Sequence, residues 1–509
     1  MTVNSAAIDA VRQVFARTVK LRETPGMTWG IVKNGEVIAS DGHGCSHLVE
    51  GSPAADAFTP GADSISRICS MTKSVTAASI LALRDEGRLQ LDAPVADYVP
   101  EAAAIQPATP DSPVLTIRHL LTMSAGFVTD NPWGDRMESM TREQFAQLLR
   151  GGLGWVHAPG TGFEYSNTGY ALLGRVIDEV SGRDYADYLT TRFLRPLGMH
   201  DTIWSVAEAN GDQRARLLQG HRRNDQRGGA CFERIEFDQP GVYGAMAGLF
   251  STVTDLALWT HFLASANLAV LPGGSPAPHG ELLSAASRRE MQQIHRIQDL
   301  PPVNGAFTRV RGYGYGLFPE RLPDLGHLVS HSGGYPGFGS FMIWHRDSGL
   351  GVVALANAKY GPAMRASMQA LREILAHDPS ALASPPAELA EPAKDGVRQS
   401  LRWLALEDPT SAEGDAIADQ LFAENMDPDV PREERSRRVD AALWLAGLDK
   451  QVLRDVTDEQ VTVVSRANGQ VKLDGPAGTL TVDVLMDPRE HAKVQSITTM
   501  TVQRGPQPL

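Results

Sequence analysis

Cysteine, net positive charge and long apolar runs are scarce in this 509-residue sequence. Its three cysteines, Cys45, Cys69 and Cys231, include no Cys-x-x-Cys pair, so we expect neither a disulfide framework nor a cysteine metal site. The net charge of −13 and the lack of a basic stripe argue against nucleic-acid binding. No apolar run approaches transmembrane length, and we expect no membrane association.

Other signals that identify particular classes of protein are missing as well. The first twenty residues carry charges throughout and have no apolar core, so we expect no secretory signal and a cytoplasmic location. No His-Glu-x-x-His helix occurs, and we expect no metal or organic cofactor. The composition, 42% hydrophobic and 21% charged, is typical of a soluble globular protein, and the length predicts two or three domains.

The first three quarters of the chain has strand patterns near both ends and helical patterns between them. Residues 27–44 predict a hairpin that turns at Asn34-Gly35. The pattern as a whole predicts one α+β domain whose sheet joins N-terminal and C-terminal strands. The further predicted elements are helices at 5–20, 116–126, 141–150, 171–182 and 362–376, and strands within 327–346 and 348–358.

A change of composition after residue 376 predicts a domain boundary. We place the first domain at 1–376, a Pro/Ala-rich linker at 377–394 and a small C-terminal α+β domain at 395–509. In the small domain, VTVVSRANGQVKL predicts a hairpin that turns at Asn468-Gly469.

Ser70 and Lys73 lie three residues apart at the start of a helical pattern. A helix that begins at Ser70 places both side chains on one face. Residues 74–83 carry no charge, which predicts a buried helix. A buried lysine whose pKa falls can take the proton of a serine hydroxyl and so activate a nucleophile. In the alternative interpretation, Ser70 caps the helix and Lys73 extends to the surface.

Tyr165-Ser166-Asn167 lies in a glycine-rich loop just before a helix. A phenol near an ammonium loses its proton more easily and can act as a general base, while an asparagine amide can hold a substrate carbonyl and bond to the lysine. A buried aromatic and a helix cap are the alternative.

His331-Ser332-Gly333-Gly334 begins a strand pattern. Gly333 allows close approach of a substrate backbone, and the N–H groups of Gly334 and Ser70 could receive an oxyanion. His331 could orient a carboxylate or share a proton network with Tyr165; an ordinary histidine at the end of a strand is the alternative.

The three motifs together resemble the penicillin-recognising serine hydrolases, the group of class C β-lactamases, DD-peptidases, D-aminopeptidases and related esterases. Ser-x-x-Lys, Tyr-x-Asn and His-Ser-Gly occur in the order of that family, and the resemblance covers about residues 25–376. Flanking text also resembles the family, including DEGRLQLDAPVADYVPE, TIRHLLTMSAGF, PGTGFEYSNTGYALLGRVIDEVSG and HSGGYPGFGS.

The resemblance implies a fold and a set of roles. The fold would be α+β: a β-lactamase-like domain, with an antiparallel sheet covered by helices on both faces plus an all-helical lobe, followed by the small domain. Ser70 resembles the acylated nucleophile, Lys73 its activator and Tyr165 the acid/base for the leaving group. The expected substrate-binding residues are Asn167, His331, Ser332, Gly333 and Gly334.

The motifs favour a serine hydrolase that acts on a small ester, amide or peptide through an acyl-Ser70 intermediate. His331 stands where β-lactamases of the family have a lysine, which weakens a β-lactamase interpretation. A DD-carboxypeptidase or class C-like β-lactamase, acyl transfer to another acceptor and a non-catalytic acyl-binding receptor remain alternatives. A lipase-type hydrolase needs Gly-x-Ser-x-Gly, and Thr122–Gly126 lacks its first glycine.

Two questions about surroundings stay open in the sequence. We expect residues 127–140, with Trp133, and residues 207–239 to form walls of the cleft. The C-terminal domain could cap the cleft, contribute to a homo-oligomer or only stabilise the fold. We predict that deleting it changes substrate preference more than acylation of Ser70.

Overall fold

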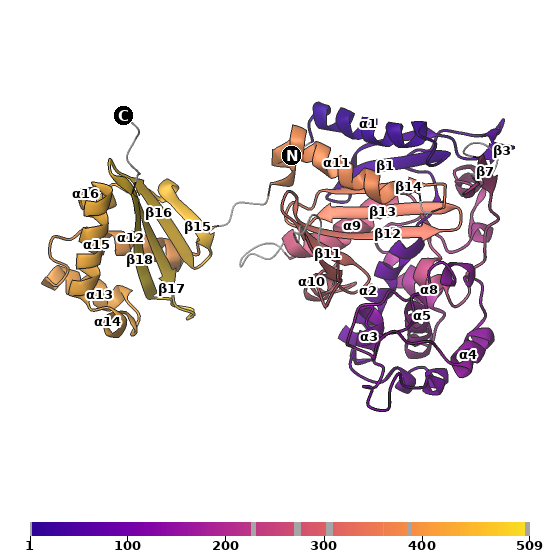
Figure 1. The fold of residues 1–509 in the computed structure, drawn as a ribbon, viewed down its shortest axis with the longest axis horizontal. Helices are drawn as coiled ribbons and strands as arrows, with labels where there is room; N and C mark the ends of the chain where they lie inside the picture. The colour runs from indigo at the N-terminus through magenta and orange to yellow at the C-terminus, as the bar shows by residue number, and fades with distance from the viewer. Residues whose placement is uncertain are drawn as a thin grey trace. The chain divides into compact units, whose positions relative to one another are not determined.

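The chain forms two compact units, Met1–Ser384 and Pro385–Leu509. The computed structural model describes residues 3–224, 231–268, 276–301, 309–359, 361–383 and 388–503. Each unit has its own hydrophobic core and is described by itself (Figure 1). Within these ranges, no helix combines the length and apolar character needed to cross a bilayer.

The first unit is built on an eight-stranded antiparallel sheet. Its strand order is β2-β1-β14-β13-β12-β11-β10-β9, so a strand from the start of the chain pairs with one from the end of the unit. Met27 lies opposite Ala356, and Asn34 and Gly35 form the predicted turn with φ of 54° and 81°. The predicted joining of N-terminal and C-terminal strands is therefore confirmed. The strands are β1 (Gly26–Lys33), β2 (Glu36–Gly44), β9 (Arg296–Ile297), β10 (Val310–Tyr313), β11 (Phe318–Leu322), β12 (Gly326–Tyr335), β13 (Phe338–His345) and β14 (Gly351–Ala356).

Helices cover both faces of this sheet. On one face lie α1 (Ser5–Lys20) and α11 (Ala363–His377), and the ring of Phe15 stacks on Trp29 of β1 at 5.1 Å (Figure 1). The opposite face packs against α9 (Val253–Leu268), which is apolar around most of its circumference, as expected of a helix buried between two layers.

A helical lobe adjoins the α9 side. Its central helices are α2 (Thr72–Asp85), α5 (Asn167–Ser181) and the short α8 (Gly244–Ala247), which pack on one another. The other helices of the unit are α3 (Ile117–Leu121), α4 (Arg142–Gly151), α6 (Tyr185–Leu189), α7 (Gly211–Ala215) and α10 (Ala285–Met291). Short 3₁₀ turns and one π turn are η1 (Cys69–Met71), η2 (Val95–Asp97), η3 (Pro100–Ala104), η4 (Gly134–Arg136), η5 (Thr190–Leu194), η6 (Val206–Glu208) and η8 (Pro379–Leu382).

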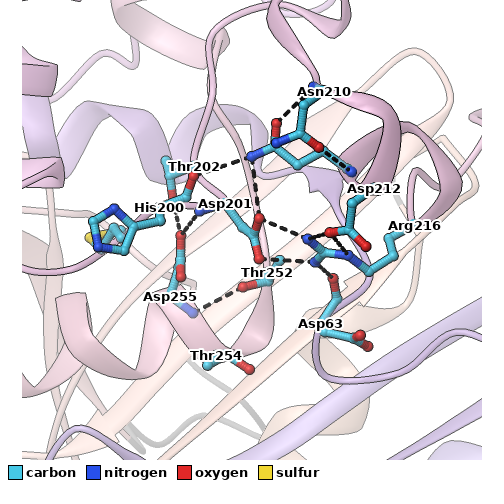
Figure 2. Close-up of polar contacts among 12 residues, drawn as sticks. Asp63, His200, Asp201, Thr202, Asn210, Asp212, Arg216, Thr252, Thr254 and Asp255 are labelled. Atoms are coloured by element: carbon cyan, nitrogen blue, oxygen red, sulfur yellow. Dashed lines mark hydrogen bonds and ion pairs between the residues drawn. The ribbon is translucent and has the colours of Figure 1, made fainter.

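Residues 207–239, which we expected to form a wall of the cleft, contain regular secondary structure. Apart from 225–230, which lie outside the described residues, they include α7 and the paired strands β6 (His221–Asn224) and β7 (Cys231–Arg234). A polar cluster ties this stretch down: Asp201 receives both terminal nitrogens of Arg216 at 2.9 Å (Figure 2). Thr202 beside it donates to Asp255 of α9 at 2.7 Å. The remaining strand pairs are β3 (Leu48–Val49) with β4 (Ser52–Pro53), and β5 (Ser66–Arg67) with β8 (Phe250–Ser251).

The second unit packs helices on a four-stranded antiparallel sheet of order β15-β16-β17-β18. The predicted Asn468-Gly469 turn is wrong. Ser465 pairs with Asn468, so the chain turns at 466–467 and Gly469 lies inside a strand. A Cβ on Gly469 would approach Val397 of the first helix to 2.7 Å, so this glycine permits close packing. The elements are α12 (Glu391–Leu404), α13 (Ala412–Leu421), α14 (Met426–Asp429), α15 (Arg432–Ala446), α16 (Gln451–Arg454), η9 (Asp458–Gln460), β15 (Val461–Ser465), β16 (Asn468–Asp474), β17 (Gly478–Met486) and β18 (Val494–Gln503).

Two predicted boundaries also differ. The stretch 377–394, predicted as a linker, contains η8 and the first turn of α12, because Pro379 and Pro392 occupy first-turn positions where a missing N–H costs nothing. The helix predicted over 116–126 ends at Leu121, since Met123 and Gly126 both adopt positive φ.

Candidate active site

Ser70 lies in a strained turn rather than at the first position of a long helix. It belongs to η1, and the regular helix α2 begins two residues later at Thr72. Cys69 has a φ of 53°, a conformation that non-glycine residues rarely adopt. Strain of this kind persists only where the surroundings impose it, and it is common at functional sites.

Lys73 is the best-defined neighbour of Ser70. Its side chain has no exposed surface, and its Nζ lies 3.1 Å from Ser70 Oγ. Nζ also lies 2.7 Å from Asn167 Oδ1 and 3.1 Å from the carbonyl oxygen of Met246 in α8. The two amide-type oxygens can only accept hydrogen bonds. A neutral amine that donates to both therefore turns its lone pair toward the third neighbour, Ser70 Oγ.

The surroundings of Lys73 lower its pKa to about 7, mainly through burial, which Asp130 and Asp135 partly oppose. A substantial fraction of the amine is thus neutral near pH 7. Burial of Lys73 between the packed helices therefore places a proton acceptor, its neutral amine, beside the Ser70 hydroxyl.

Tyr165 and Asn167 reach the site from the start of α5. Ser166 caps this helix, and the carboxylate of Asp130 accepts from the backbone N–H groups of Asn167 and Thr168 at 2.7 Å. Two capping interactions fix the first turn, so the Asn167 side chain points back toward Lys73.

Tyr165 differs from our expectation in its acidity. Its ring lies 5.0 Å from Lys73 Nζ, yet burial raises its pKa well above the ordinary value, and a hydrogen bond with Ser70 lowers it only in part. We expected the lysine to make this phenol easier to deprotonate, but desolvation dominates. In the resting site Tyr165 therefore keeps its proton, and the neutral Lys73 amine is the group that can accept one.

His331 lies in β12 and is fully buried. Its Nδ1 is 2.7 Å from the carbonyl oxygen of Ser332, and its Nε2 is 3.1 Å from the hydroxyl of Tyr313. Burial, with a contribution from Lys73, lowers its pKa to about 3, so the ring is neutral at physiological pH.

Gly333 allows β12 to lie against the Ser70 turn. A Cβ at this position would be 2.0 Å from Ser340 Oγ and 2.4 Å from the carbonyl oxygen of Ile68, so any side chain would push the strand away. Ser70, Tyr165, Ser332, Gly333 and Gly334 all line one cavity of about 400 Å³. Lys73, Asn167 and His331 lie behind its wall.

Seven further described residues line the cavity, and none of these carries a charged side chain. They are Asn131, Phe163, Gln298, Phe318, Ser340, Gly361 and Met364. Asn131 belongs to the predicted wall 127–140, whereas Trp133 packs edge-on against Tyr243 instead. No described residue of 207–239 lines this cavity.

Several contributors to the site have no signal in the sequence. Asp130, Met246 and Tyr313 belong to no motif and approach Ser70 only through tertiary packing. An acidic residue in a loop or a tyrosine between glycines is too common to single out.

A family model described as Beta-lactamase matches residues 11–377. The chain belongs to the beta-lactamase family. Members of this family are serine hydrolases that act on ester and amide bonds.

Three relatives illustrate the beta-lactamase family match. Protein flp of Staphylococcus aureus (strain MW2) is 28% identical over 348 residues, which cover 65% of this chain and 59% of flp. The octameric penicillin-binding protein homologue from Pyrococcus abyssi has a TM-score of 0.59 at 22% identity and covers 96% of this chain and 100% of its own. The D-amino acid amidase from Ochrobactrum anthropi SV3 has a TM-score of 0.56 at 23% identity over 74% of this chain and 99% of its own.

Proposed function

We propose that the protein hydrolyses small esters or amides, including peptides with a D-residue, through an acyl enzyme on Ser70. The observation that carries the proposal is the position of Lys73: two fixed oxygens take its two hydrogens and direct its lone pair at Ser70 Oγ. This is the arrangement that a general base needs.

In the proposed reaction, Lys73 takes the Ser70 proton while Oγ forms a bond to the substrate carbonyl carbon. The tetrahedral oxyanion collapses, the bond to the leaving group breaks, and Tyr165 gives that group its proton. The Lys73 ammonium then returns a proton to Tyr165. Water attacks the acyl carbon by the reverse proton path and releases the acid, which restores Ser70.

The cavity favours esters and uncharged amides over substrates with a carboxylate beside the scissile bond. Its described lining has no cationic side chain, and His331 is neutral with both nitrogens engaged. A DD-carboxypeptidase or class C-like β-lactamase is therefore the second candidate. The name of the Ochrobactrum relative, a D-amino acid amidase, supports the amide branch.

The test is initial rates on a short-chain p-nitrophenyl ester, a D-alanine p-nitroanilide and a cephalosporin, each with a Ser70→Ala control. Turnover of the ester or the anilide that disappears in Ser70→Ala supports the proposal. Dominant cephalosporin turnover supports the second candidate. A stable acyl-Ser70 without turnover supports an acyl-binding receptor, and activity that survives Ser70→Ala contradicts all three.

A second proposal concerns whether copies of this chain associate. The Pyrococcus relative is described as octameric, and we propose that this chain likewise forms a homo-oligomer. Light scattering of the purified chain measures its molar mass in solution. The mass of a monomer at micromolar concentration contradicts the proposal of a homo-oligomer.

A further inference from the structure

Both ring nitrogens of His331 are committed inside the protein. A carbonyl oxygen only accepts, so the 2.7 Å contact with Ser332 O requires the hydrogen on Nδ1. In a neutral ring Nε2 is then an acceptor, and the hydroxyl of Tyr313 at 3.1 Å is its donor. The tautomer of His331 follows from these two partners.

The bond from His331 to Ser332 supports β12 where the sheet no longer does. Pairing of β12 with β11 ends at Ser330, opposite Phe318, whereas pairing with β13 continues to Tyr335. From His331 onward the described ladder therefore holds β12 on one side only. The imidazole, bonded to the carbonyl of the next residue, stiffens the strand just before Gly333 and Gly334.

Tyr313 contacts the site at a second point. It ends β10, and its ring meets that of Tyr165 edge-on with centroids 6.4 Å apart. It also packs edge-on against His331 at 6.0 Å and against Phe318 at 4.6 Å. The groups that face it include Tyr170 and the Arg311 side chain that lies over Phe318. One buried side chain thus contacts the proposed leaving-group acid and the histidine that supports β12.

We propose that Tyr313 is a positioning residue of the hydrolase, which acts through His331 to hold β12 and through its ring to hold Tyr165. The inference rests on the proposed function of Ser70. Tyr313 is not among the described residues that line the cavity. Its hydroxyl keeps His331 in the tautomer that bonds to Ser332, and loss of the hydroxyl leaves a buried acceptor without a donor.

Tyr315 offers a matched control two residues away. It is equally buried, and its hydroxyl bonds to Arg118 at 2.5 Å and to Glu290 at 3.3 Å, away from the Ser70 cavity. Tyr315→Phe removes the same atom from the same glycine-rich segment. A general effect of losing a buried tyrosine hydroxyl would therefore be seen in both variants.

The experiment compares kcat and KM of wild type, Tyr313→Phe and Tyr315→Phe on the best substrate, with the rate at which a fluorophosphonate labels Ser70. We expect Tyr313→Phe to lose about tenfold in kcat and in labelling rate with KM changed by less than about twofold, because small misplacements of reacting groups lower turnover more than binding. Tyr315→Phe should stay within about twofold of wild type in all three.

A double-mutant cycle tests whether Tyr313 acts through His331. His331→Asn keeps a donor for the Ser332 carbonyl but has no counterpart of Nε2. Adding Tyr313→Phe to His331→Asn should cost less than about twofold further, whereas independent action predicts the full tenfold loss again. Additive losses, or equal losses in Tyr313→Phe and Tyr315→Phe, overturn the inference.

A spectroscopic measurement covers the case in which Tyr313→Phe fails to fold. Imidazole ¹⁵N–¹H correlation spectra of wild type should show His331 with its proton on Nδ1 and a hydrogen-bonded, unprotonated Nε2, as they should for the buried His221, whose Nδ1 faces a carbonyl oxygen and whose Nε2 accepts from Leu48 N–H. Of these two signals, only that of His331 should be lost in His331→Asn. An Nε2–H tautomer at His331 overturns the inference. If wild-type turnover does not need Ser70, the proposed function fails as well; if it does, only the role of Tyr313 is at stake.

Discussion

Arg67 and Glu138 face each other 3.6 Å apart, with each side chain only 1% exposed. Arg67 lies three residues before Ser70, sandwiched between the rings of Phe250 and Tyr335. Burial raises the pKa of Glu138 to about 7, although Arg67 opposes the rise. The pair places a titratable carboxyl behind the site, and its charge raises the pKa of Lys73.

Glu138→Gln should move the acidic limb of the pH profile of kcat/KM to lower pH. Lys73 must be neutral to accept the Ser70 proton, so activity rises as pH rises through its pKa of about 7. Removing the Glu138 charge lowers that pKa, and the limb of kcat/KM should move by roughly half a unit to lower pH.

The control for this shift is Glu143→Gln, which removes the same charge from an exposed position of α4. The measurement is kcat/KM from pH 5 to 9 for wild type and both variants. A limb that stays in place in Glu138→Gln, or moves equally in Glu143→Gln, contradicts the coupling.

Asn167→Ala should separate catalysis from helix capping. It removes the acceptor 2.7 Å from Lys73 Nζ and should lower kcat/KM by roughly a hundredfold, because the amine loses its orientation. The adjacent Ser166→Ala removes only the cap on Gly169 N–H and should cost about 1 kcal/mol of unfolding free energy with kcat nearly unchanged. Denaturant unfolding and steady-state rates on both variants provide the comparison; equal kinetic losses would mean that Asn167 acts only as part of the helix start.

Asp255→Asn should change how stability depends on pH. Burial raises the pKa of Asp255 to about 6, so the folded state binds this proton more tightly than the unfolded chain. The contribution of protonated Asp255 to the free energy of unfolding is fully present below about pH 4 and is lost as pH rises through 6. Asparagine keeps an acceptor for Thr202 and never ionises, so the Tm of the variant relative to wild type should rise by roughly 2–5 °C between pH 5 and pH 8.

Asp212→Asn in the same polar cluster is the control, because Asp212 is exposed (Figure 2). Its Tm difference from wild type should vary little over that range. A parallel change in both variants would assign the effect to net charge instead of the buried carboxyl.

Truncation after residue 383 should leave a folded protein that still reacts at Ser70. The core clusters of the sheet unit extend no further along the chain than Leu382, and the second unit has a separate core. We expect fluorophosphonate labelling within about threefold of the full chain and a larger change in the ratio of ester to anilide turnover. Loss of folding, or an unchanged ratio, contradicts this prediction.

Local signals in the sequence predicted the strands at the two ends of the sheet domain, but not β9, β10 and β11. One dipeptide shows the limit of such signals: Asn34-Gly35 forms a turn, whereas Asn468-Gly469 enters a strand because Gly469 packs under Val397. Both dipeptides follow an apolar run and precede alternating residues, so nothing nearby in the sequence separates them.

The motifs predicted which residues would meet, but not how each would ionise. Ser70, Lys73 and Tyr165 lie together as expected, yet the acidity of Tyr165 depends on how completely the lobe removes water from it. That quantity is set by many side chains distant in sequence. Asp130, Glu138 and Tyr313 were not predicted for the same reason.

The complete burial of Lys73 has a consequence for chemical modification. Its amine is neutral to a greater extent near neutral pH than that of a surface lysine, yet its side chain has no exposed surface and its neighbour Ser70 is the residue that lines the cavity. Amine-directed reagents will therefore modify the surface lysines first and leave activity intact. On the proposed function, a reagent that abolishes activity through this lysine would have to enter the cavity beside Ser70, and its size and charge would outline what that cavity admits.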